Sequence, residues 1–160
     1  MSHLLNEIIK NPKTVVTTHT SAQLTSNSGN VSEVLTGSEI TYTPISGASK
    51  VIYEITFYCE KLNGNSFMGF YLEEYESSTW TEINTKHRRN FGNGTGTNSQ
   101  RWYTHFRFVL PSWSGSKQLR LTVSHQSDES SLTLNQMTEW DGAGSVTDKF
   151  CNTNLLVYSI

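Results

Sequence analysis

Ile40–Lys61, ITYTPISGASKVIYEITFYCEK, is the stretch around which the rest of this chain is expected to fold. Its first strand ends at Thr43-Pro44, because a proline holds the residue before it in an extended conformation. A Ser- and Gly-rich corner follows, and Lys50–Lys61 then alternates apolar side chains with others. Such alternation is typical of a strand with one buried face. The core residues expected on that face are Val51, Tyr53, Ile55, Phe57 and Cys59.

The composition of the 160 residues favours a β-protein. Charged residues make up only 16%, against roughly 25% in an average soluble protein, and Ser, Thr, Asn and Gly take their place. These residues disfavour long helices and suit turns and the polar outer faces of sheets. The net charge of -2 gives no bulk attraction to nucleic acid or to a membrane surface. No apolar run approaches the roughly 20 residues that span a bilayer. Neither nucleic-acid binding nor membrane insertion is therefore expected.

Alternating segments continue to the end of the chain. They predict about eight to ten strands at spacings of about 8–15 residues, the pattern of an antiparallel β-sandwich or barrel. Asn63-Gly64 marks a hairpin, and Asn90–Asn98 and the segment between Met137 and Asp148 are predicted to be loops. The strands expected besides Lys50–Lys61 are Thr14–Thr20, Glu39–Thr43, Ser66–Tyr75, Trp80–Ile83, Gln100–Leu110, Leu119–His125, Ser131–Met137 and Asn154–Ile160.

The first residues form the one predicted helix, Ser2–Lys10, which Asn11-Pro12 ends. A helix this short is marginal alone, because isolated helices need roughly 12–15 residues, so it is expected to dock on its own domain or on a partner. Residues 1–12 are accordingly interpreted as an attachment segment and residues 13–160 as a single β-sandwich domain. This start lacks the features of a secretory signal, which favours a protein made and assembled in a cytoplasm. The apolar stripe of the helix is Leu4, Leu5, Ile8 and Ile9.

The strand Gln100–Leu110 has an unusual outward face. Its inward face holds Trp102, Thr104, Phe106, Phe108 and Leu110. Its outward face carries Arg, Tyr and His where an exposed sheet face usually carries Thr, Ser and Lys. Tyr and Arg are enriched at protein interfaces, so the outward residues are candidates for an oligomer interface. The alternative is a set of cross-strand ion pairs with Glu73, Glu74 or Glu76. The outward residues are Arg101, Tyr103, His105 and Arg107.

Three tryptophans expected in loops, Trp80, Trp113 and Trp140, are candidates for stacking on sugar rings, and rim packing of the sandwich is the alternative. The basic run Lys86–Arg89 suits either an anionic ligand or a solvated hairpin tip. The aromatic loops are expected at the end of the domain opposite the N-terminal segment.

No catalytic, metal or cofactor motif is found in the sequence. The five histidines have no metal-ligand spacing, and GNGTG at Gly92–Gly96 lacks the Lys-Ser/Thr of a phosphate-binding loop. No nucleophile motif such as GxSxG is present. Cys59 shares the face of the core residues, so it is interpreted as a buried thiol and not as half of a bridge to Cys151. The sequence therefore predicts a protein that is not an enzyme and needs no cofactor.

The strand ending in Thr43-Pro44, the Ser-rich corner and the Ser49–Ile52 entry to the long strand resemble the β-rich domains of bacteriophage virion proteins. The closing segment Asn154–Ile160 is similar to the apolar last strand of that group. The resemblance covers roughly Thr14 to Ile160. It implies a jelly-roll-like sandwich of the tumour-necrosis-factor or fibre-head type, which commonly forms trimers. The chain has no shaft, coiled coil or collagen-like segment before the domain, which favours a small virion component attached through its N-terminal segment.

The leading hypothesis is a non-enzymatic structural protein of a bacteriophage particle. On this hypothesis it is a trimeric fibre or spike head, or a capsid or tail decoration, that contacts other virion proteins and a host surface glycan. A stand-alone carbohydrate-binding module is the alternative, and it predicts a monomer that binds sugar. A small β-sandwich enzyme would need His and carboxylate side chains converging in one cleft.

Overall fold

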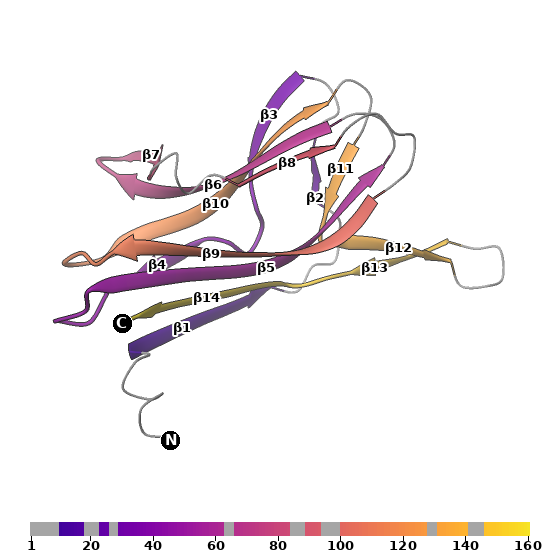
Figure 1. The fold of residues 1–160 in the computed structure, drawn as a ribbon. Helices are drawn as coiled ribbons and strands as arrows, with labels where there is room; N and C mark the ends of the chain where they lie inside the picture. The colour runs from indigo at the N-terminus through magenta and orange to yellow at the C-terminus, as the bar shows by residue number, and fades with distance from the viewer. Residues whose placement is uncertain are drawn as a thin grey trace.

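The computed structural model describes residues 10–17, 23–25, 29–62, 66–83, 89–93, 100–127, 131–140 and 146–160. Every regular element in these ranges is a β-strand (Figure 1). No helix in this part of the chain is long and apolar enough to cross a membrane. The strands are β1 (Lys10–Thr17), β2 (Gln23–Thr25), β3 (Gly29–Val34), β4 (Ile40–Tyr42), β5 (Lys50–Leu62), β6 (Ser66–Glu76), β7 (Thr79–Glu82), β8 (Arg89–Asn93), β9 (Gln100–Pro111), β10 (Lys117–Ser127), β11 (Ser131–Leu134), β12 (Gln136–Trp140), β13 (Val146–Phe150) and β14 (Thr153–Ser159).

All of these strands except β12 and β13 form two curled antiparallel sheets that face each other, and β12 and β13 pair with each other in a separate two-stranded sheet. In sheet A the order is β1-β14-β5-β9, with β11 and then β2 continuing beside the far half of β5. In sheet B, β10 and β6 lie at the centre, with β3 and β4 beside β10 and with β7 and β8 beside β6. The eight-strand framework appears when β3 with β4 and β7 with β8 each count as one broken strand and the short strands β2, β11, β12 and β13 are left aside. Numbered along the chain, the two sheets then read 1-8-3-6 and 2-7-4-5. This is the strand order of a jelly roll, so the expected antiparallel β-sandwich is confirmed.

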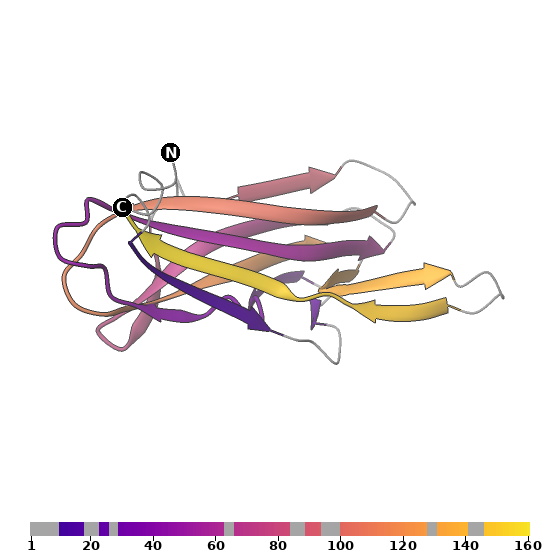
Figure 2. The same ribbon diagram turned by 90° about the horizontal axis from the view of Figure 1, so that it is seen from below.

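The core lies between the sheets and is centred on β5. This strand pairs with β9 along its whole length, from Lys50↔Pro111 to Lys61↔Gln100, and Figure 2 shows it between β9 and β14. The aromatic ring of Phe57 packs against two others, at 5.2 Å from Phe70 on sheet B and 5.7 Å from Phe106 on β9 (centroid distances). The core predicted for β5 is confirmed, because each of these side chains has no exposed surface: Val51, Tyr53, Ile55, Phe57 and Cys59.

Three predicted segments differ from the structure. Ser131–Met137 is broken at Asn135, which has a φ of 61° and whose buried side chain donates to Thr153 Oγ1 at 3.0 Å. The loop predicted between Met137 and Asp148 contains most of the hairpin β12–β13. The first part of the glycine-rich loop Asn90–Asn98 belongs to β8, which pairs with β6. In each case pairing with a neighbouring strand decides the conformation, and a local pattern does not contain that information.

The predicted helix lies outside the described residues, except for Lys10, the first residue of β1. Its apolar stripe Leu4, Leu5, Ile8 and Ile9 is therefore not placed. The start of β1 is fixed on the sandwich beside β4. Asn11 donates through Nδ2 to the carbonyl oxygen of Thr43 at 2.9 Å, and Lys13 Nζ donates to that of Thr41 at 2.8 Å.

Candidate functional site

The outward residues of β9 lie together on the outer face of sheet A, as the sequence predicts. Arg101, Tyr103, His105 and Arg107 are all exposed, and Val109 continues the row. These five residues are called the β9 stripe. Tyr103 is 64% exposed and Val109 46%, which makes them two of the most exposed large apolar side chains among the described residues.

Both arginines of the β9 stripe form ion pairs with β5. Arg107 Nε lies 2.9 Å from Glu54 Oε1, and the hydroxyl of Tyr158 donates to the same oxygen at 3.2 Å. Arg101 Nε lies 2.7 Å from Glu60 Oε1. The prediction of pairs with Glu73, Glu74 or Glu76 is wrong in its partners, because those residues lie on β6 in sheet B and β9 pairs with β5.

The neighbours of the β9 stripe on sheet A include buried side chains that the alternation places outward. Ile52 lies between Val109 and Tyr158 and is 1% exposed, and Tyr58 packs edge-on against Tyr103 at 5.2 Å and is 2% exposed. Burial, with a smaller contribution from Glu60, raises the pKa of Tyr58 to about 12. Sequence reasoning missed this second buried layer. Its signal was the apolar pair Val51-Ile52, which interrupts the alternation of β5.

Trp80 lies on the outer face of sheet B, where it packs against Arg120 and Tyr75. The guanidinium carbon of Arg120 is 4.0 Å from the centroid of its ring, and the ring of Tyr75 is 5.2 Å away. Arg120 also pairs with Glu73 at 2.7 Å. The indole is thus packed against its own sheet, which fits the rim-packing alternative for this tryptophan.

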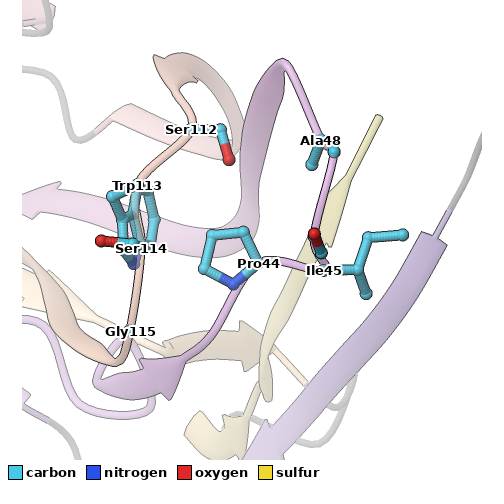
Figure 3. Close-up of a pocket in the computed structure, with 9 residues that line it drawn as sticks. Pro44, Ile45, Ala48, Ser112, Trp113, Ser114 and Gly115 are labelled. Carbon is cyan, nitrogen blue, oxygen red and sulfur yellow. The ribbon is translucent and has the colours of Figure 1, made fainter.

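Trp113 lines an open pocket of about 470 Å³ between two turns, Pro44–Ala48 and Ser112–Gly115 (Figure 3). The first turn is closed by a hydrogen bond from the Ala48 amide to the Ile45 carbonyl at 3.2 Å. Each turn contains a glycine with a left-handed backbone, Gly47 at φ 82° and Gly115 at φ 78°, a conformation that other residues adopt at a steric cost. The local sequence therefore fixes the shape of both walls.

A second hollow of about 230 Å³ shares Ser112 and Trp113 with the first. It also contains the ion pair of Lys117 Nζ with Glu74 Oε2 at 2.7 Å. Lys117 Nζ lies 5.8 Å from the centroid of the Trp113 ring. Charge is thus present on one side of the indole, and it is already paired.

The three candidate tryptophans do not meet. The Trp113 pocket lies at the end of the sandwich where β1 starts and the chain ends, since the amides of Ser49 and Lys50 donate to the Ile160 carbonyl. Trp140 ends β12, in the hairpin at the far end (Figures 1 and 2). The expectation that the aromatic loops lie opposite the N-terminal segment is therefore wrong for Trp113.

No group of three or more His, Cys, Asp or Glu side chains in the described ranges could hold a metal ion. Both cysteines are free, as predicted, and burial raises the pKa of the Cys59 thiol to about 12, so it is not a nucleophile at neutral pH. His3, His19 and residues 86–88 of the basic run lie outside the described residues.

The comparisons with known proteins concern the fold. No protein-family model and no curated protein matches the chain. Among solved structures, it is similar to a chain of infectious bursal disease virus, Gt strain, with a TM-score of 0.46 and 13% identity over 94% of this chain and 37% of that one. The Gx strain gives a TM-score of 0.46 and 12% identity over the same shares.

A third similar structure is the enzymatically active domain of tailspike protein 4 of bacteriophage CBA120. Its TM-score is 0.34, with 9% identity over 78% of this chain and 18% of that one. The present chain thus spans little more than a third of the two bursal disease virus chains and less of the tailspike chain. At these scores and identities, the likenesses establish neither a family nor a function.

Proposed function

We propose that this chain is a non-enzymatic structural component of a virus particle that assembles with copies of itself through the β9 stripe. The jelly-roll connectivity supports the first part, because such double sheets build viral capsid domains as well as lectins. A fold hosts many functions, so the resemblance of Ile40–Ile52 and Asn154–Ile160 to bacteriophage virion domains is what favours the virion. The trimer and the particle's identity as a bacteriophage belong to the same proposal.

The observation that carries self-association is the mixture of exposed area and neutralised charge on the β9 stripe. Tyr103 and Val109 offer exposed apolar area. Arg101 and Arg107 keep their side chains about half exposed, at 47% and 52%, although each is paired with a carboxylate of β5. Such a surface presents exposed aromatic area and half-exposed guanidinium groups with little net charge, so a second copy can approach it without repulsion.

The experiment is a mass measurement by sedimentation or light scattering on the wild type and on the double variant Arg107→Glu with Tyr103→Ala. The wild type is expected at three times the chain mass, and the variant at a dissociation constant at least about tenfold higher. The control is Gln118→Glu with Tyr75→Ala, which makes the same kind of change at exposed positions of sheet B and should leave the mass unchanged. A monomeric wild type, or equal behaviour of the two variants, would contradict the interface.

The virion role has a test of its own. In a reconstruction of the particle that contains this protein, the jelly roll is expected in sets around a three-fold axis, with the β9 stripe turned toward that axis. A position away from any such axis would overturn the trimer, and absence from purified particles would overturn the structural role.

A further inference from the structure

The pocket beside Trp113 has the chemistry of a saccharide site, and we propose that it binds a neutral sugar residue. The proposal is independent of self-association, because the pocket lies at one end of the sandwich and the β9 stripe lies on the outer face of sheet A.

The lining of the pocket excludes a charged ligand. None of its residues has an ionisable side chain. Lys117 and Glu74, which lie in the neighbouring hollow, are paired with each other at 2.7 Å. Because binding a charge requires an opposite charge or a dense set of donors, an anion or a cation has no counterpart here.

The same lining favours a ligand with both apolar and hydroxyl surfaces. Trp113 supplies a flat apolar ring beside the buried Pro44, and Ser46, Ser112 and Ser114 supply hydroxyls that both donate and accept hydrogen bonds. A pyranose has this combination, with C–H groups on its faces and hydroxyls around its edge.

The size and rigidity of the pocket fit a small ligand. Its volume of about 470 Å³ falls within the roughly 300–1,000 Å³ of small-molecule sites. The left-handed glycines Gly47 and Gly115 fix the two walls. Trp113 is further held edge-on by Tyr42, with 6.3 Å between the ring centroids. A preformed wall of this kind costs little ordering on binding.

The test is a titration followed through the indole N–H signals of the four tryptophans, with Trp113 assigned from Trp113→Phe. The probes are the methyl glycosides of glucose, galactose, mannose and N-acetylglucosamine, with a sialic acid glycoside and a proline-rich peptide for comparison. At least one neutral glycoside is expected to shift the Trp113 signal with a dissociation constant of about 1–10 mM, as for a single small ligand unit.

A matched pair of variants separates the pocket from the rest of its loop. Ser114→Arg places a long side chain into the pocket and should weaken binding at least about tenfold. Ser116→Arg makes the same change at an exposed position two residues on that does not line the pocket, and should leave binding unchanged. Both positions are exposed, so both variants are expected to fold.

Three results would overturn the proposal: no shift of Trp113 at about 50 mM of any neutral glycoside, stronger binding of the sialoside or the peptide, or equal effects of the two arginines. The mass measurement tests self-association through the β9 stripe, and its outcome does not depend on the sugar titration. A monomer that binds sugar would contradict only self-association, and an oligomer that does not bind sugar would contradict only the saccharide site.

Discussion

Arginine–glutamate pairs lie on both outer faces of the sandwich, but the surroundings of Arg120 on sheet B differ from those of Arg107 on sheet A. On sheet B, Arg120 and Glu73 have side chains only 20% and 13% exposed, and Trp80 and Thr122 complete their contacts. On sheet A, Arg107 pairs with a partly buried glutamate but keeps 52% of its own side chain exposed. On the face of sheet B the Arg120–Glu73 pair is enclosed by its own chain, and on the face of sheet A a half-exposed guanidinium and exposed apolar area stay accessible to another molecule.

The comparison shows that a surface can carry an ion pair and still be able to bind another molecule. An exposed pair contributes little to stability, because water screens it and the side chains lose entropy. A pair enclosed by an indole and a threonine hydroxyl contributes more, since its loss leaves a partly buried charge without a partner. Variants that separate these two cases can be ranked by the size of the expected effect.

The largest effect is expected beneath both faces, at the ring of Phe57, which touches residues of both sheets. Phe57→Ala should lower the free energy of unfolding by about 3–5 kcal/mol, because a large ring is replaced by a cavity. Urea denaturation followed by tryptophan fluorescence and by circular dichroism measures it, with Ser116→Ala, an exposed change outside the β9 stripe, as the control. The two probes should report one transition. Two separated transitions would mean that the faces belong to independent units, and the comparison between them would lose its basis.

The second effect separates the faces directly. Glu73→Ala removes the acceptor of Arg120 Nε and of Thr122 Oγ1, at 2.7 and 2.8 Å. Hydrogen bonds to a charged group contribute about 1.5–3 kcal/mol each, but Glu82 lies opposite in the register and relief of like-charge repulsion offsets part of the loss. We expect a net loss of about 2 kcal/mol in urea denaturation. Glu76→Ala, an exposed change on the same strand, should stay within about 0.5 kcal/mol, and an equal loss in both would contradict the enclosed pair.

The inner half of this architecture could be predicted from the sequence, because alternation reports directly on a buried face. Every residue expected in the core of β5 is fully buried, and the inward residues Thr104, Phe106, Phe108 and Leu110 of β9 are buried as well. The positions of the long strands follow from the same signal. The alternation does not show which strands pair with each other. The ion-pair partners expected for Arg101 and Arg107 were wrong for this reason.

The candidate sites were less predictable, since they depend on long-range neighbours. The sequence named Trp113 but could not show that Pro44–Ala48, far away in the chain, forms the other wall of its pocket. It also placed Ile52 and Tyr58 on an outward face, although Val109, Tyr158 and Tyr103 pack around them. The self-association and saccharide sites stay predictions until the experiments above are done.

The third effect concerns a buried hydroxyl on sheet A. Tyr58 Oη is buried and has no hydrogen-bond partner among the described residues, so Tyr58→Phe should raise the free energy of unfolding at pH 7 by about 1 kcal/mol. The pKa of Tyr58 is raised from 10.0 to about 12. Between these values the folded state keeps a proton that the unfolded state loses, so this tyrosine makes the wild type lose stability as pH rises.

Urea denaturation between pH 8 and about pH 11 measures both parts of this prediction. Tyr58→Phe should reduce the alkaline loss without abolishing it, because the buried thiol of Cys59 also has a raised pKa, about 12. Exposed Tyr75→Phe on sheet B is the matched control and should change neither value. A destabilised Tyr58→Phe at pH 7 would show that the hydroxyl has a partner that stabilises the fold.

The smallest effect on stability is expected at Arg107. With the guanidinium half exposed, Arg107→Ala should cost the isolated chain less than about 0.5 kcal/mol, measured by urea denaturation at a concentration where the wild type is monomeric. The same variant should raise the dissociation constant of self-association, because a half-exposed guanidinium contributes more when a second molecule removes it from water. A loss of about 2 kcal/mol in the monomer, equal to that of Glu73→Ala, would mean that this pair is enclosed too. The Arg107–Glu54 pair would then be enclosed like the Arg120–Glu73 pair of sheet B, and the interface would have to lie on another surface.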